Sequence, residues 1–160
     1  MKINAYASYV PKEELKSFTY ERAPKENEIV VSINSCSITR GDIRFIDNYW
    51  NDTNYPMVPG LEIIGKVTEI GKDVKDIKIG DIVGIGYQVE SCFTCEYCLA
   101  GKEQFCLNQK LIPVHGYGGL ADTIIVDYRF AFKIPENLQS PDATPLLCSG
   151  LTPYAAIKKC

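Results

Sequence analysis

Histidine is scarce in this chain of 160 residues, because His115 is the only one, within the segment PVHGYGG. A single imidazole cannot build a metal site alone, and the glycines around it favour a loop. We expect His115 at the surface, since loops are normally exposed. Basic runs are also missing, and the net charge of −3 argues against nucleic-acid binding.

Long apolar stretches are missing as well. No run approaches the roughly 20 apolar residues that a membrane helix needs, and the N-terminal stretch has no signal-peptide core. We therefore expect a cytoplasmic protein whose thiols stay reduced. The dinucleotide fingerprint G-x-G-x-x-G is absent too. Gly84 and Gly86 begin a partial match, but Val89 takes the last position, so we interpret them as strand glycines.

Cysteine, by contrast, is plentiful, with seven in the chain. Four of them follow the spacing C-x2-C-x2-C-x7-C: Cys92, Cys95, Cys98 and Cys106. Four thiolates close a tetrahedron around one Zn²⁺ at about 2.3 Å each and leave no open position, so the pattern predicts one structural zinc per chain. The related iron–sulfur run has its fourth cysteine sooner and a proline after it, whereas Leu107 follows here. A reducing compartment disfavours the other alternative, two disulfides.

The rest of the chain predicts one mainly β domain with short helices. Apolar residues make up 46% of it and charged residues 23%, which is ordinary for a globular protein. Glycines punctuate the β-branched runs, as in a small barrel. The expected strands lie at 28–35, 62–70, 81–87, 122–132 and 133–135.

Two helices are also expected. One covers 40–50, where apolar residues recur near helical spacing. The other begins near Thr152, with Thr152 as a plausible N-cap and Pro153 at the first helical position. Because this second helix has barely begun when the chain stops, we expect a fragment of a longer protein.

The order of these motifs resembles the N-terminal, GroES-like domain of zinc-containing medium-chain alcohol dehydrogenases, most closely the cinnamyl alcohol dehydrogenase-like branch. The resemblance extends over roughly residues 25–158, and its main carriers are 55–86, 91–106, 118–135 and 144–158. It implies a GroES-like twisted β-barrel domain at 1–150 with a four-cysteine zinc lobe at 91–106. It also implies that 151–160 starts a linker helix to a Rossmann domain, absent from this sequence, that would bind NADP or NAD.

The resemblance further implies a catalytic zinc with three protein ligands, and here this chain departs from the pattern. The family's motifs are C-H-[ST]-D, G-H-E and P-L-L-C-A-G. Their counterparts are TRGD at 39–42, GLE at 60–62 and PLLCSG at 145–150. Thr39 and Leu61 therefore replace two ligands, and Cys148 remains beside Glu62 as a degenerate catalytic set. Gly41 takes the place of the hydroxyl that begins the family's proton relay.

Several alternatives stay open at this point. Cys148 is a relic ligand, a reactive thiol or, as we favour, a buried core residue. Glu62 either supports the site or pairs with Arg40. Cys36 falls on a position that holds a non-ligand cysteine in this branch, and both it and Cys160 are interpreted as small buried apolar residues. By resemblance, Thr152 would lie near the nicotinamide.

The leading hypothesis is an oxidoreductase that moves hydride between NAD(P)H and a small-molecule alcohol, carbonyl or activated alkene, with the 160-residue chain alone inactive. Loss of the catalytic zinc points to an already electrophilic substrate, as in quinone oxidoreductases. The alternative is a non-catalytic zinc-stabilised module, or a truncated inactive family member, that binds a partner. No nucleic-acid or membrane partner is expected. The sequence leaves the oligomeric state open, a homodimer included.

Overall fold

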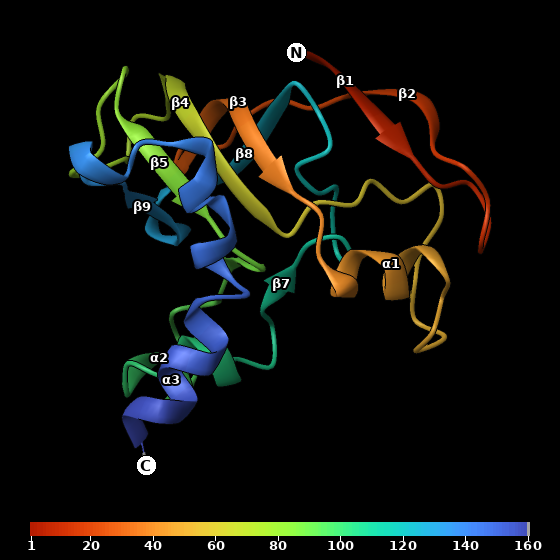
Figure 1. Ribbon diagram of the computed structural model, residues 1–160. Helices are drawn as coiled ribbons and strands as arrows, with labels where there is room; N and C mark the ends of the chain where they lie inside the picture. Colours follow the sequence, from red (N-terminus) through yellow and green to blue (C-terminus); the bar gives the residue numbers. More distant parts are fainter. Residues whose placement is uncertain (160) are drawn as a thin grey trace.

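The computed structural model describes residues 1–159 and is built around one curled antiparallel sheet (Figure 1). The sheet forms a half-barrel, which confirms the mainly β, GroES-like fold class. Its strands, in spatial order, are β8 (Thr123–Asp127), β3 (Glu28–Ser37), β4 (Glu62–Ile70), β5 (Ile82–Ile85) and β9 (Ala131–Lys133).

Side chains alternate between the two faces of the sheet along each strand, and both faces carry apolar residues. The concave interior is filled by fully buried side chains such as Ile29, Val31 and Ile63, which belong to one large core cluster. Val30, which points the other way, packs with Ile3 and Ile125 in a second cluster. A period-2 pattern with both faces buried accounts for the consecutive β-branched residues Ile29, Val30 and Val31 at the start of β3.

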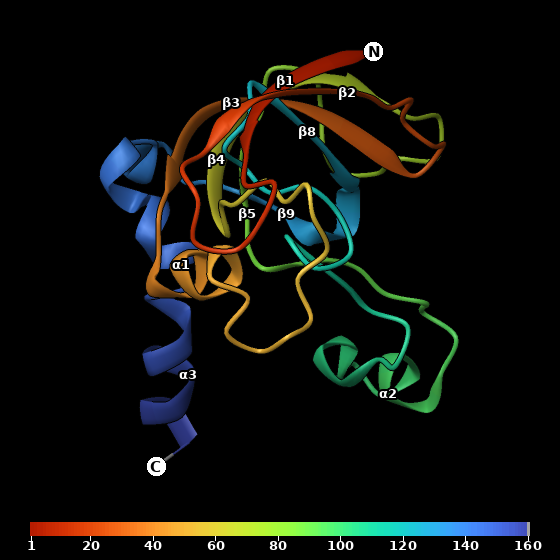
Figure 2. The ribbon, with the colours of Figure 1, turned by 90° about the vertical axis from the view of Figure 1, so that its right-hand side faces the viewer.

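The second apolar face is covered by a hairpin that the sequence interpretation missed. Strands β1 (Lys2–Ala7) and β2 (Lys16–Glu21) pair in antiparallel fashion and lie above β3 and β8 (Figure 2). Every second residue of β1 is buried, and the bridges Ala5–Ala121 and Ser8–Met57 join the hairpin to the loops below it. The hairpin thus extends the half-barrel without joining its main hydrogen-bonded sheet.

Several expected elements differ from the observed ones. The strand expected at 133–135 is β9, two residues earlier, and the one expected at 81–87 is the shorter β5. The run at 122–132 is broken by a 3₁₀ turn at Tyr128–Phe130, where the Asp127 side chain accepts a hydrogen bond from the Arg129 N–H. The first helix, α1 (Arg40–Ile46), is shorter than predicted. Helix α3 (Leu151–Lys159) begins before Thr152, so the predicted N-cap is wrong, and the Thr152 hydroxyl instead donates to the Cys148 carbonyl at 2.8 Å.

The remaining elements form two extensions from the sheet (Figure 2). One is the four-cysteine lobe, residues 91–106, which contains α2 (Glu96–Leu99) and a 3₁₀ helix at Glu103–Phe105. The lobe lies between two short strands, β6 (Gln88–Glu90) and β7 (Lys110–Leu111), which pair with each other. The other runs through 3₁₀ helices at Glu136–Leu138 and Pro141–Leu147 into α3. None of the described helices is both long and apolar enough to cross a membrane. Cys160 lies outside the described residues.

Candidate functional site

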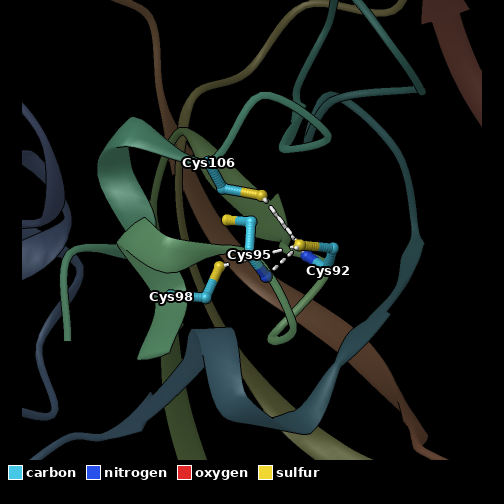
Figure 3. Close-up of side chains that lie close together, drawn as sticks. All are labelled: Cys92, Cys95, Cys98 and Cys106. Carbon is cyan, nitrogen blue, oxygen red and sulfur yellow. Dashed lines mark hydrogen bonds between the residues drawn. The ribbon is translucent and has the colours of Figure 1, made fainter. Parts of the chain in front are cut away.

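The four cysteine side chains of the lobe lie around one small space (Figure 3). Their sulfur atoms are all within 4.8 Å of one another, with Cys92 Sγ 3.5 Å from Cys106 Sγ and 3.9 Å from Cys98 Sγ. A tetrahedron with Zn–S bonds of about 2.3 Å has S–S edges of about 3.8 Å. The residues therefore fit a closed Zn(Cys)₄ centre.

Local backbone structure places each thiol. Cys92 follows β6, Cys95 is the N-cap of α2, and Cys98 lies inside that helix. Backbone N–H groups point at the sulfurs, because Cys95 N donates to Cys92 Sγ and Cys92 N donates to Cys106 Sγ, both at 3.4 Å. Hydrogen bonds from Thr94, through its backbone and side chain, and from the Cys95 backbone lower the pKa of the Cys92 thiol. These donors favour a thiolate at Cys92, whereas burial first, and then the neighbouring cysteines, raise the pKa of the Cys98 thiol.

The two positions where the family's ligands are replaced also meet in space. A methyl group placed on Gly41 would lie 3.0 Å from Leu61 Cδ1 and 3.1 Å from Thr39 Oγ1. Leu61 is only 5% exposed and belongs to the main core cluster. The structure therefore brings Thr39, Gly41 and Leu61 to one place, but what they present there is a hydroxyl and an apolar side chain.

The Thr39 hydroxyl already has a structural role. It accepts a hydrogen bond from Asp42 N at 3.2 Å as the N-cap of α1, while the Asp42 carboxylate accepts from Thr39 N and Gly60 N at 2.7 Å each. Asp42 is fully buried, and burial raises its pKa although these donors oppose the shift. This network, which sequence reasoning missed, joins the start of α1 to the segment that carries Leu61. A Thr followed three residues later by an acid is the signal that predicts such a cap.

Glu62 is a buried hydrogen-bond acceptor with 1% exposure. Its carboxylate accepts from the Ser37 hydroxyl and from Ser149 N, beside Cys148. Among the ion pairs of residues 1–159, none joins Glu62 to Arg40, so that pairing is wrong. Glu62 instead connects β3 to the turn that leads into α3.

Cys148 is half-buried rather than a core residue, which corrects the interpretation that we favoured. Burial, followed by the negative charge of Glu62, raises the pKa of its thiol. Cys36 is also half-buried and packs against the core, and burial raises its pKa to about 12. Both thiols are therefore protonated near neutral pH. His115 is exposed, as predicted.

Within residues 1–159, the lobe is the only place where three or more His, Cys, Asp or Glu ligand atoms converge. Cys148 and Glu62 belong to no such group. Sequence reasoning also missed an aromatic cluster next to α1, in which the Phe45 ring lies 4.9 Å from Trp50 and 6.3 Å from Tyr87. Its only signal in the sequence is that Phe45 and Trp50 lie five positions apart, within the stretch expected to be helical.

A curled antiparallel half-barrel with a closed four-cysteine lobe is the architecture of the GroES-like domain of medium-chain dehydrogenases. Residues 25–136 match the alcohol dehydrogenase GroES-like domain, and the chain belongs to this family, as an N-terminal domain of its cinnamyl alcohol dehydrogenase-like branch.

Relatives in sequence and in structure agree on this assignment. The chain is 40% identical over 153 residues to a probable cinnamyl alcohol dehydrogenase from Arabidopsis thaliana, covering 90% of this chain and 42% of that protein. It is 39% identical over 144 residues to mannitol dehydrogenase from Petroselinum crispum, covering 86% and 43%. Two solved structures each match with a TM-score of 0.94, 32% identity and coverage of 99% of this chain and 48% of theirs: a cinnamyl alcohol dehydrogenase from Sorghum bicolor, and CAD from Helicobacter pylori complexed with NADP(H). The chain therefore spans less than half the length of these relatives.

Proposed function

We propose that this chain is the N-terminal, catalytic-type domain of an NAD(P)-dependent oxidoreductase that transfers hydride to or from a small-molecule alcohol or carbonyl. The observation that carries the proposal is the family match over 25–136 together with the four-cysteine cluster at the lobe position. Residues 1–150 would form the domain, and 151–160 would begin a linker to a nucleotide-binding domain. Thr152, on the exposed first turn of α3, would then lie near the cofactor.

In this proposal Cys92, Cys95, Cys98 and Cys106 hold one zinc per chain. A zinc with four thiolate ligands cross-links the lobe and takes no part in the reaction, because it has no open coordination position. Other groups of the lobe place the ligands: backbone N–H donors orient the thiolates, and the 3₁₀ helix at Glu103–Phe105 brings Cys106 back to the cluster.

We infer that the family's second, catalytic zinc site is degenerate here. Leu61 offers no ligand atom, and the Thr39 hydroxyl caps α1. One thiol and one buried carboxylate are too few donors for an open zinc site, which uses three protein ligands. Without this ion, nothing lowers the pKa of a bound alcohol, and without a hydroxyl at Gly41 the family's proton relay has no first member. The proposed substrate is therefore already electrophilic, a carbonyl or an activated alkene.

The test is hydride transfer by the full-length protein that contains this domain. With zinc loaded into the lobe, we expect oxidation of NADPH or NADH in the presence of an aldehyde such as cinnamaldehyde or an enone, followed by absorbance at 340 nm. Oxidation of primary alcohols should be much slower. A folded, zinc-loaded protein that transfers no hydride to any of these substrates would contradict the proposal. It would favour the non-catalytic module, which the presence of Thr39 and Leu61 at two ligand positions also allows.

The 160-residue chain alone is expected not to bind NADPH or NADH in the micromolar range. Its sequence lacks the glycine-rich turn that places a pyrophosphate against a helix N-terminus. Calorimetric titration of the purified chain with each nucleotide measures this directly. Saturable micromolar binding would reveal a cofactor site made by the half-barrel itself.

A further inference from the structure

One residue of the lobe adopts a backbone conformation that its side chain does not favour. Phe93, in the turn between Cys92 and Cys95, has φ of +56°. A bulky residue in the left-handed region is unusual, because its Cβ crowds the neighbouring carbonyl. Such a conformation persists only where the surrounding structure holds it in place. The contacts of the Phe93 side chain therefore identify what holds this turn.

The Phe93 ring is held by two residues from outside the lobe. The Arg129 guanidinium carbon lies 3.5 Å from the ring centroid, a separation that only an approach over the ring face permits. The Phe130 ring lies 5.8 Å away at 56°. Both residues belong to the 3₁₀ turn that follows β8, so this contact joins the metal-binding turn directly to the half-barrel.

Arg129 is itself fixed by a buried carboxylate. Asp127, 2% exposed, accepts from Arg129 Nε at 2.9 Å through Oδ1 and from Arg129 Nη2 at 2.5 Å through Oδ2. Asn27 Nδ2 donates to the same Oδ2 at 2.7 Å. A bidentate ion pair of this kind fixes the plane of the guanidinium group as well as its position. The cation is therefore presented to the ring in one orientation.

We propose that Arg129, oriented by Asp127, is a positioning residue for the metal centre: it clamps Phe93 and so keeps the Cys92–Cys95 turn in its metal-binding conformation. The turn that Phe93 forms is the one that directs the Cys95 N–H to Cys92 Sγ. Residues that orient metal ligands without touching the ion commonly change metal affinity 10- to 100-fold when they are replaced. This inference rests on the zinc content proposed for the lobe.

The clamp predicts faster loss of zinc when the cation is removed. In the zinc-loaded chain, Arg129→Gln should transfer zinc to a chromophoric chelator about tenfold faster than the unmodified chain. Arg129→Lys should fall between the two, because it keeps the charge but loses the planar fork. Arg44→Gln is the matched control, since Arg44 lies over Tyr49 and Trp50, at 5.2 and 5.7 Å, outside the lobe. Its release rate should equal that of the unmodified chain.

A second variant separates the clamp from general stability. Arg129→Gln leaves the buried Asp127 carboxylate without its charged partner, which can weaken the whole fold. Phe93→Leu keeps that pair and removes only the ring, so it should release zinc faster at an unchanged denaturation midpoint of the half-barrel. If both variants fold, hold one zinc and release it at the rate of the unmodified chain, the proposed clamp is wrong, whereas the zinc lobe is unaffected. An unmodified chain that binds no zinc would overturn the zinc lobe first, and the clamp with it.

Discussion

Replacing Cys95 with serine is expected to remove zinc from the lobe and to disorder residues 91–106, while the half-barrel stays folded. In a closed site the free energy of metal binding is folding free energy, about 10–16 kcal/mol for structural zinc in small peptides. Apart from the contacts of Phe93 with Arg129 and Phe130, the lobe has little support of its own, because α2 spans only Glu96–Leu99 and Leu99 is exposed. The sheet strands lie outside the lobe and keep their own core.

Elemental analysis and limited proteolysis measure the two parts of this result. The unmodified chain, purified without added metal, should contain close to one zinc, and Cys95→Ser close to none, with new cleavage confined to 91–106. Cys148→Ser is the matched control, because Cys148 is a half-buried thiol far from the lobe in sequence, and it should retain one zinc. Unaltered zinc content and protease resistance in Cys95→Ser would refute the structural role. Two zincs in the unmodified chain would refute the degenerate second site.

The strands that could be predicted from sequence are those whose pattern is strong and local. Strand β4 (Glu62–Ile70) has the predicted bounds, since its β-branched residues stand between Gly60 and Gly71. Strand β1 was missed because only Ile3 is β-branched, and its alternation depends on Ala5 and Ala7, which are buried by the loop around Ala121. Short strands that are stabilised by tertiary contacts leave a weak local signal.

The break between β8 and β9 has a similar explanation. Residues 122–132 look continuous in composition, yet the Asp127 side chain competes for backbone donors and starts a 3₁₀ turn. That turn sends Arg129 and Phe130 toward the lobe. The missed irregularity is thus the feature that connects the two parts of the domain.

At the candidate sites, motif spacing predicted the cysteine cluster because four thiols in one short segment must lie close together. The proximity of Thr39 to Leu61 could be expected only through the family resemblance, since 22 positions separate them. The hydrogen bond from Gly60 N to Asp42 and the contact of Arg129 with Phe93 join segments that are distant in the sequence. No local sequence pattern specifies such contacts, because they depend on how the whole chain folds.

Restoring the family's ligand set should create a second zinc site. In Thr39→Cys with Leu61→His, the new side chains would meet beside Gly41, where Thr39 and Leu61 now lie, and Cys148 would supply the third ligand. Loss of the Thr39 cap costs about 1 kcal/mol, and the imidazole enters a buried position, so metal binding must offset both. We expect zinc to rise from one to two per chain in the double variant, whereas each single variant stays at one. In the full-length protein, a zinc with an open position would then lower the pKa of bound alcohol and allow slow NAD(P)⁺-dependent oxidation of a primary alcohol. The rate should remain low because Gly41 still lacks the relay hydroxyl.

Zinc per chain is the first measurement and alcohol oxidation the second. A folded double variant that still holds one zinc would show that Cys148 does not reach this position and that the correspondence drawn for the three motifs is mistaken.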